Sequence, residues 1–368
     1  MRKRFVVIKF ICLLLFPITI ILQRIFSQFP KVIEKTYSQF LYKKISIPIS
    51  TIIEKIPFSV SSIVNYSFVI LVILYVIKII YKLFLAKEKR LILLKNTFLN
   101  TFALLGILYF LFMINWGFNY VRVPFTDTMG LDIEEKEIDS TDELYKMCDY
   151  LVLKTEELQL ELDYSNKYIS DSKEFVISSI LERSGKGYKN LSNKYAVFKG
   201  NYPQPKRILF NSINNISGSY SPFLFESNVN TSVPLNLLPF ISCHEKAHQY
   251  GYAGEDEASL IAYISCKSHT DIDFNYSGKL FALHESLSIL RNSSKNEYTQ
   301  IIKKCNTKIT NNLLEIDNFE NNQQKGVVSY FNSKIYDLYL KTNMQEEGMQ
   351  SYSGVVKLLL SLYESNQL

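Results

Sequence analysis

Three long apolar stretches in the first third of the chain dominate its pattern of hydrophobic and polar positions. They cover about residues 5–22, 63–80 and 97–114, and each is long enough for a helix that crosses a lipid bilayer. The first stretch follows Arg2-Lys3-Arg4 as a signal peptide would, but it continues into the bulky and basic Leu22-Gln23-Arg24, without a small-residue cleavage site. We therefore expect it to be retained, and residues 1–118 to form a multi-pass membrane anchor with three transmembrane helices.

Residues 119–368 have the mixed spacing of a soluble domain that is mostly helical. Ser140-Thr141-Asp142-Glu143 has the form of a capping box, which predicts a helix start. The apolar residues of this helix follow at helical spacing, at Leu144, Met147, Leu151 and Leu158. Further helices are expected from Glu255 through Tyr263 and over residues 279–290, 297–316, 327–340 and 352–363.

A small β element is expected ahead of residue 238. Residues 188–230 are rich in Asn, Ser, Gly, Tyr and Pro, and they contain short apolar runs at 196–198 and 207–210. This composition predicts loops and short strands. The predicted fold is therefore a mainly α membrane protein whose soluble domain, residues 119–368, is a mostly helical α+β unit.

The positive charge of the chain belongs to its anchor. Residues 1–115 contain 16 Lys or Arg and 3 Asp or Glu. The remaining residues contain 25 Lys or Arg and 32 Asp or Glu, and the formal net charge of the whole chain is +6. No basic patch interleaved with aromatic residues occurs in the soluble part, so we expect no nucleic-acid partner.

The positive charges also predict an orientation in the membrane. Arg2-Lys3-Arg4 precedes the first span, and four lysines and an arginine lie between the second and third spans, which favours a cytoplasmic location for both segments. Residues 23–62 are basic as well and oppose this inference. With three spans, the favoured topology leaves residues 119–368 outside the cytoplasmic membrane of a bacterium.

His244-Glu245-Lys246-Ala247-His248 is the strongest chemical signal, an HExxH pattern in a chain with only 4 histidines. Residues four apart lie on one face of a helix, so both imidazoles can reach one metal ion while Glu245 stands beside it. Pro239 fits the first turn of such a helix, where its missing N–H is harmless. We predict Zn²⁺ as the cofactor, His244 and His248 as ligands and Glu245 as the general base.

A third zinc ligand is expected shortly after the motif. Gly251 can end the helix in a left-handed conformation and turn the chain back toward the metal. Glu255 is the preferred third ligand, with Glu257 as the second choice and Asp256 or a more distant residue as the remaining ones. Residues two apart on a helix diverge by about 200°, so Glu255 and Glu257 cannot both face the metal.

The chemistry implied by three protein ligands is hydrolysis. A catalytic zinc keeps its fourth position for water, lowers the pKa of that water, and leaves a base to take the proton and pass it to a departing amine. A cysteine-based structural zinc site or a disulfide framework is not expected, because the five cysteines are thinly spread and none forms a C-x-x-C pair. His269, His284 or Tyr276 could assist as oxyanion donors, but ordinary polar roles are the simpler interpretation.

Several stretches besides the HExxH motif resemble one bacterial family of integral-membrane zincin-like proteins, classed as domain of unknown function 3810. They are Asn115-Trp116-Gly117-Phe118-Asn119-Tyr120, Ser217-Gly218-Ser219-Tyr220-Ser221-Pro222-Phe223, Glu255-Asp256-Glu257-Ala258, Tyr339-Leu340-Lys341-Thr342-Asn343 and Gly348-Met349-Gln350-Ser351-Tyr352-Ser353-Gly354-Val355-Val356. The resemblance implies a membrane anchor followed by a metallopeptidase-like site, and it names no substrate. Where such sequences commonly have Asn, this chain has Ser259, which predicts the loss of a hydrogen bond behind the site.

Two function classes follow from these patterns. The first is a membrane-anchored zinc metallopeptidase that hydrolyses an unknown peptide or protein at the outer face of the cytoplasmic membrane. The alternative is a non-catalytic sensor or scaffold that uses a zincin-like fold to bind a partner. The intact Glu245 favours catalysis, because a scaffold could lose the base and keep its histidines. The oligomeric state is left open.

Overall fold

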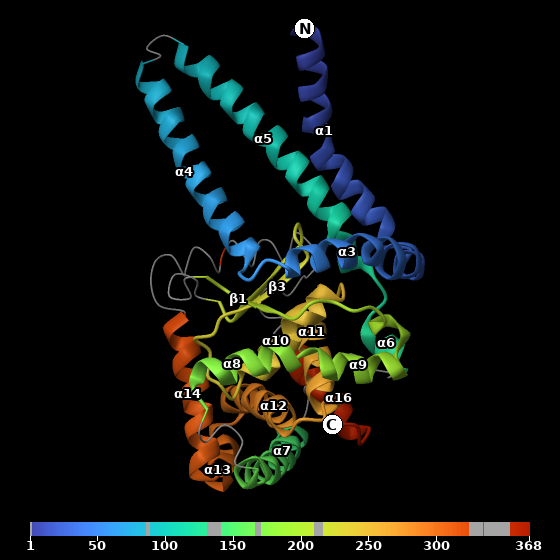
Figure 1. The fold of residues 1–368 in the computed structure, drawn as a ribbon, viewed down its shortest axis with the longest axis vertical. Helices are drawn as coiled ribbons and strands as arrows, with labels where there is room; N and C mark the ends of the chain where they lie inside the picture. The colour runs from blue at the N-terminus through green and yellow to red at the C-terminus, as the bar shows by residue number, and fades with distance from the viewer. Residues whose placement is uncertain are drawn as a thin grey trace. The chain divides into compact units, whose positions relative to one another are not determined.

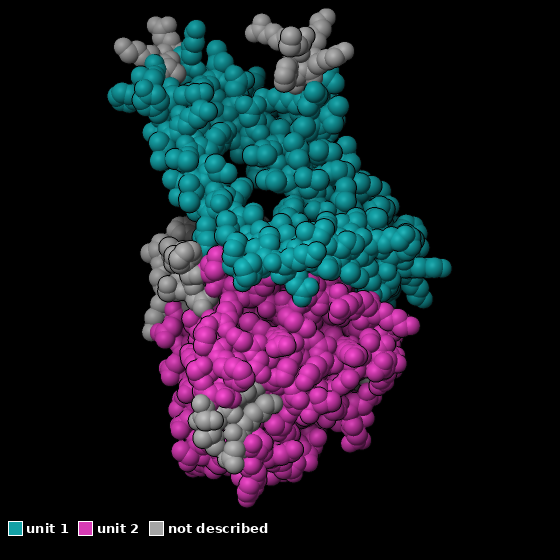
Figure 2. All heavy atoms as spheres, viewed as in Figure 1, with its two compact units in different colours: residues 1–123, 221–225 teal, residues 124–220, 226–368 magenta. Residues whose placement is uncertain are grey.

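The computed structural model describes residues 2–85, 89–130, 141–165, 171–209, 216–323, 334 and 354–368. The chain forms two compact units, which are coloured separately in Figure 2. Unit 1 consists of residues 1–123 and 221–225, and unit 2 consists of residues 124–220 and 226–368.

Unit 1 is helical. Its elements are α1 (Arg2–Phe26), α2 (Pro30–Ile33), a π-helix η1 (Glu34–Leu41), α3 (Tyr42–Glu54), α4 (Val60–Leu85), α5 (Arg90–Asn115) and a 3₁₀ turn η3 (Gly117–Val121). Three segments are long and apolar enough to cross a membrane, namely Val7–Phe26, Val60–Leu85 and Arg90–Asn115. The prediction of three such helices is confirmed, and each helix is longer than its predicted stretch because the flanking residues, polar and apolar, continue it.

The surface of α4 is strongly apolar. Leu71 and Ile80 of α4 are exposed by 63% and 60%, although both are apolar. Such a surface is stable only when lipid or another apolar phase covers it. Helices α1 and α5 pack together (Figure 1), and a Cβ at Gly106 of α5 would lie 2.7 Å from the Cys12 carbonyl oxygen of α1. The small residue therefore permits the close approach of the two backbones.

A buried ion pair ties the segment after α1 to the end of α5. The Arg122 guanidinium donates to both carboxylate oxygens of Glu34, at 2.9 and 2.8 Å. The Arg122 side chain is only 2% exposed and that of Glu34 is 17% exposed. The Tyr37 hydroxyl also donates to the Ile114 carbonyl at 2.8 Å. These contacts attach the π-helix to the exit of the third candidate span.

Unit 2 contains a helical body and a small sheet. Its helices are α6 (Phe125–Met129), α7 (Thr141–Tyr164), α8 (Lys173–Arg183), α9 (Gly185–Lys194), the 3₁₀ turn η4 (Ala196–Phe198), α10 (Leu238–Gln249), α11 (Glu255–Lys267), α12 (Ile272–Ser293), α13 (Lys295–Lys304), α14 (Thr307–Gln323) and α16 (Gly354–Glu364). Its strands are β1 (Lys206–Arg207), β2 (Gly218–Ser221) and β3 (Glu226–Val229). The predictions of a mostly helical chain and a small β element are confirmed.

The centre of unit 2 is formed by α10, α11 and α12, with α7 packed along α12. The sheet has the order β1-β3-β2, and β1 runs parallel to β3 with Lys206 opposite Asn228. Strand β3 is buried over its whole length and packs against α10. The sheet therefore lies directly beside the helix that carries the HExxH motif.

Some elements differ from the sequence-based expectation. The single helix expected over residues 297–316 is two helices, because the Asn306 side chain accepts a hydrogen bond from the Ile309 N–H at 2.9 Å and starts α14. The run at 196–198 is a 3₁₀ turn and not a strand. Of the helix expected over residues 327–340, only residue 334 is among the described residues.

Candidate metal centre

Helix α10 carries the motif through the interior of unit 2. Every residue from Leu238 to Gln249 is buried, and Pro239 lies in the first turn as expected. The buried Lys246 ammonium donates to the carbonyl oxygens of Tyr202 and Pro203, at 3.1 and 2.9 Å. A buried charge needs such acceptors. These two bonds attach the loop that contains Tyr202 and Pro203 to α10.

A left-handed residue ends α10 and turns the chain toward α11. Gly251 has a φ of 86°, which strongly favours glycine. The Gly251 N–H donates to the His248 carbonyl at 2.9 Å, and the Tyr252 N–H donates to the Ala247 carbonyl at 3.1 Å. After this turn α11 begins at Glu255, so the first turn of α11 returns to the histidine face of α10.

His244, His248 and Glu255 converge. The His244 Nε2 atom lies 3.1 Å from His248 Nε2 and 3.1 Å from Glu255 Oε2, and His248 Nε2 lies 3.5 Å from the same oxygen. All three residues are buried. Two ligand atoms of a tetrahedral zinc ion, each about 2.0–2.1 Å from the metal, are separated by about 3.3 Å. The three side chains fit zinc in both spacing and donor type.

The atoms behind the imidazoles hold the rings in place. The His248 Nδ1 atom lies 2.7 Å from the Tyr252 carbonyl oxygen, so this nitrogen carries the proton and leaves Nε2 facing the site. The Ser259 hydroxyl lies 3.2 Å from His244 Nδ1. The expected loss of a hydrogen bond at Ser259 therefore does not occur, because the serine side chain from the next turn of α11 reaches the ring.

The alternatives to Glu255 lie elsewhere. The Glu257 carboxylate accepts a hydrogen bond from the Phe125 N–H at the start of α6. The Asp256 carboxylate accepts from the Glu257 N–H at 2.8 Å and also lies beside Gly354. Glu255 is thus the acidic residue of this turn that the structure brings to the histidines.

Glu245 lies against strand β2. A Cβ atom at Gly218 would lie 2.3 Å from Glu245 Oε1, so only a glycine leaves room for this carboxylate. The second oxygen, Oε2, is buried and has no hydrogen-bond partner among the described residues. Gly218 lies in a stretch quoted for the family resemblance, but the sequence alone assigned it no role.

The site has a strongly perturbed electrostatic environment. Burial raises the pKa of Glu245 to about 8; the Glu255 charge also raises it, whereas His248 opposes the shift. Burial alone lowers the pKa of His248, but the charge and hydrogen bond of Glu255 outweigh burial and raise it to about 9. Burial alone raises the pKa of Glu255, but the charges and hydrogen bonds of His248 and His244 outweigh burial and hold it well below the usual range. A cation is therefore strongly favoured beside Glu255, whether it is an imidazolium or a metal ion.

A comparison with known families matches residues 37–360 to one family, described as protein of unknown function (DUF3810). The match covers most of the chain, including two candidate spans and all residues of the candidate metal centre. The chain belongs to this family. No curated protein and no solved structure matches it.

The other polar residues considered for this DUF3810 protein have structural contacts of their own. The His269 ring stacks on Phe274 with centroids 3.9 Å apart, and its Nε2 atom lies 3.0 Å from the Arg183 carbonyl oxygen. The Tyr276 hydroxyl accepts a hydrogen bond from the Asn312 amide at 2.6 Å. These contacts support the ordinary structural role for both residues.

His284 of the DUF3810 protein joins α12 to α14 through carboxylates. Its Nε2 atom lies 3.1 Å from Asp317, and its Nδ1 atom lies 3.2 Å from Glu285. With Glu285 and Glu320 it forms a second group whose ligand atoms lie within 4.8 Å of one another. Burial alone lowers the pKa of His284, but the hydrogen bonds to Asp317 and Glu285 outweigh it and raise the pKa to about 10. An imidazolium held by carboxylates accounts for the arrangement.

The raised pKa of His284 predicts a loss of stability in alkali. The unfolded pKa is about 6.5, so the contribution is complete below that pH and disappears as the pH rises toward 10. We expect His284→Gln to cost about 1–3 kcal/mol of unfolding free energy at pH 6, and much less at pH 10. Thermal unfolding of both proteins in detergent micelles measures this difference. A gap between the two proteins that stays constant from pH 6 to pH 10 would contradict the assignment.

Proposed function

We propose that this DUF3810 protein is a membrane-anchored, zinc-dependent peptidase whose catalytic unit adopts a zincin-like fold. The convergence of His244 Nε2, His248 Nε2 and Glu255 Oε2 at 3.1–3.5 Å, beside a buried glutamate, carries the proposal. His244, His248 and Glu255 would hold the zinc ion. When bound, zinc polarises a carbonyl group and lowers the pKa of water.

Glu245 supplies the proton transfer in this proposal. Its unpartnered Oε2 atom accepts a proton from the attacking water, the water oxygen bonds to the peptide carbon, and the carbon–nitrogen bond then breaks. The proton passes from Glu245 to the departing amine, so the carboxylate is regenerated. A base with a pKa near neutrality suits both halves of this cycle.

The ligand assignment predicts different effects for two neighbouring glutamates. Glu255→Ala removes an oxygen that faces both histidines, so we expect zinc affinity to fall by at least about 10-fold, since even changes behind a ligand cost 10–100-fold. Glu257→Ala removes the acceptor for the Phe125 N–H and should have a smaller effect. Competition of each purified variant with a chromogenic zinc chelator measures the affinities.

The same zinc measurement also tests the proposed function, because that function requires a bound zinc ion. A wild-type protein that binds substantially less than one zinc ion per chain would contradict the proposal, as would a larger zinc loss in Glu257→Ala than in Glu255→Ala. A protein that binds zinc with the expected ligands but hydrolyses no peptide would support the sensor or scaffold alternative.

The proposed location of the catalytic unit is outside the cytoplasmic membrane of a bacterium, where its peptide or protein substrate would lie. The charge distribution of the spans supports this orientation. To test it, Cys12 and Cys305 are replaced by serine, which leaves three buried cysteines. A membrane-impermeant maleimide applied to intact cells should then label a Tyr164→Cys variant, because Tyr164 is 85% exposed. The matched Lys89→Cys variant should stay unlabelled until the cells are opened; the reverse pattern would place the site in the cytoplasm.

A further inference from the structure

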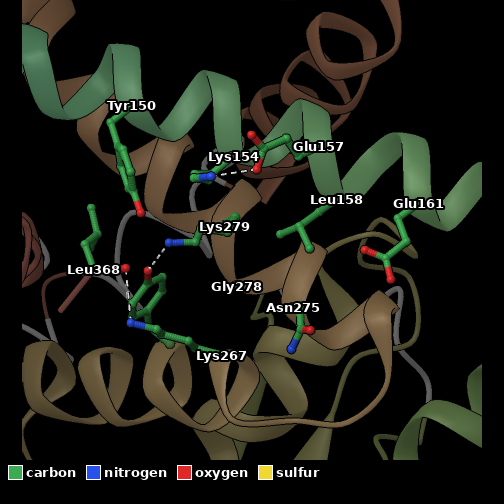
Figure 3. Close-up of a pocket in the computed structure, with 11 residues that line it drawn as sticks. Tyr150, Lys154, Glu157, Leu158, Glu161, Lys267, Asn275, Gly278, Lys279 and Leu368 are labelled. Carbon is green, nitrogen blue, oxygen red and sulfur yellow. Dashed lines mark hydrogen bonds and ion pairs between the residues drawn. The ribbon is translucent and has the colours of Figure 1, made fainter. Parts of the chain in front are cut away.

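Unit 2 contains a pocket of about 310 Å³ that includes none of the metal-centre residues (Figure 3). Helices α7, α11 and α12 form its walls, with Leu368 at one side. The volume lies at the lower end of the range for small-molecule sites. The pocket therefore has room for a compact ligand.

A buried ammonium group lines this pocket without an acidic partner. Lys279 of α12 is 8% exposed, and its Nζ atom donates to the Tyr263 hydroxyl at 2.6 Å. The same atom lies 5.5 Å from the centroid of the Tyr150 ring and 5.2 Å from that of the Tyr263 ring. Within the described ranges, no carboxylate forms an ion pair with Lys279. Buried charges are ordinarily paired, so an anionic group in this pocket would stabilise the charged form of Lys279.

Two further lysines line the pocket, and each has a partner of its own. The Lys267 ammonium donates to the Leu368 main-chain oxygen at 3.1 Å, and the Lys154 ammonium is paired with Glu157 at 2.7 Å. Burial, with the charges of Lys267 and Lys154 acting in the same direction, lowers the pKa of Lys279 to about 7. In Figure 3 the three ammonium groups lie toward the Tyr150 end of the pocket, and the Glu161 carboxylate lies at the other end.

We propose that this pocket binds the phosphate group of a small molecule. Lysines bind phosphate as point charges, and no arginine fork of the kind that selects a planar carboxylate lines the pocket. Lys154 is paired with Glu157, which leaves Lys279 and the neighbouring Lys267 for a ligand. The two negative charges of a phosphate group match these two lysines better than the single charge of a carboxylate does. The half-buried ring of Tyr150 offers an apolar surface for the rest of the ligand, whereas the Tyr263 ring is buried behind Lys279.

Binding of a phosphate should be linked to protonation of Lys279. The titratable side chains that line the pocket with it are Tyr150, Lys154, Glu157 and Glu161 on α7, and Tyr263 and Lys267 on α11. The main-chain oxygen of Leu368 also lies at the pocket, against Lys267. An anion beside Lys279 favours its charged form, so the complex holds a proton that the free protein loses above about pH 7. The affinity should consequently fall as the pH rises from 7.0 to 8.5. A phosphate monoester with a second pKa near 6 stays dianionic over this interval, so its own titration does not mask the effect.

Phenyl phosphate is a suitable probe, because it joins a phosphate to an aromatic ring. Isothermal titration calorimetry with the full-length protein in phosphate-free buffer should detect its binding at pH 7.0, and weaker binding at pH 8.5. Lys279→Gln should weaken the binding by at least about 10-fold and remove the pH dependence, because it deletes a charged donor. Lys303→Gln, the same change at an exposed lysine of α13, should leave both unchanged.

Several results would overturn the proposal. They are the absence of wild-type binding up to about 10 mM probe, equal affinity in Lys279→Gln, and equal affinity for acetate and phenyl phosphate. If Lys279→Gln fails to fold, as shown by its thermal unfolding, Lys267→Gln replaces it, because Lys267 is exposed and its loss leaves the core unchanged. Inorganic phosphate, tested in parallel, should bind more weakly than phenyl phosphate, because it lacks the ring that would contact Tyr150. The measurement is of binding alone, so it does not depend on the proposed peptidase activity.

Discussion

Glu245→Gln should leave zinc bound to the protein and lower peptide hydrolysis by about 10²–10⁴-fold, the usual contribution of a general base. Glutamine has nearly the same shape as glutamate, but its amide cannot take a proton from water. Glu245 makes none of the short contacts that join His244, His248 and Glu255, so its replacement removes no proposed ligand. Zinc content by mass spectrometry and hydrolysis of a quenched fluorescent peptide library measure the two effects separately.

Glu182→Gln is the matched control for this substitution. Glu182 lies on α8 with an exposed side chain, so the same chemical change there should alter neither zinc content nor hydrolysis. His248→Ala is the opposite control, because it should lose the metal and the activity together. If Glu245→Gln loses as much zinc as His248→Ala, Glu245 holds the metal and is not the base; if it retains wild-type activity, another group is the base.

The second large effect is expected from a residue outside the motif. In Gly218→Ala the added Cβ would lie 2.3 Å from Glu245 Oε1, 2.6 Å from its Cγ atom and 2.7 Å from its Cδ atom. These distances are far shorter than van der Waals contact, and Glu245 is buried, so the carboxylate must move. A displacement of about 1 Å can cost 10²-fold in rate. We expect at least that loss of peptide hydrolysis, with zinc still bound.

Ser219→Ala distinguishes this effect from a general weakening of the sheet. Ser219 is the next residue of β2, and successive side chains of a strand point to opposite faces. Ser219→Ala should therefore retain activity, while Gly218→Ala does not. Full activity in Gly218→Ala, measured with the same peptide library, would show that Glu245 does not need its present position.

The parts of the site that sequence could predict are those fixed by helix geometry. The spacing of His244 and His248 places two rings on one face of any helix. The three apolar spans were equally clear, because length and composition alone define them.

The remaining features depend on contacts between segments far apart in the chain, which no local pattern encodes. Gly218 meets Glu245 only because β2 joins the sheet beside α10. Nothing in the motif indicates that Lys246 is buried, but in the structure its ammonium donates to the carbonyl groups of Tyr202 and Pro203. Lys279 likewise follows an ordinary helical pattern, and its place among other lysines results from the packing of three helices.

The ion pair between Glu34 and Arg122 has a consequence for the order in which the protein is assembled. Glu34 leaves the ribosome well before Arg122, since two of the three candidate spans are encoded between them. During that interval the glutamate lacks the guanidinium that neutralises it in the finished unit. The π-helix can therefore complete its native contacts only after the third candidate span has been synthesised. A nascent chain halted before Arg122 should expose this segment to proteases, and one long enough for Arg122 to have left the ribosome should protect it.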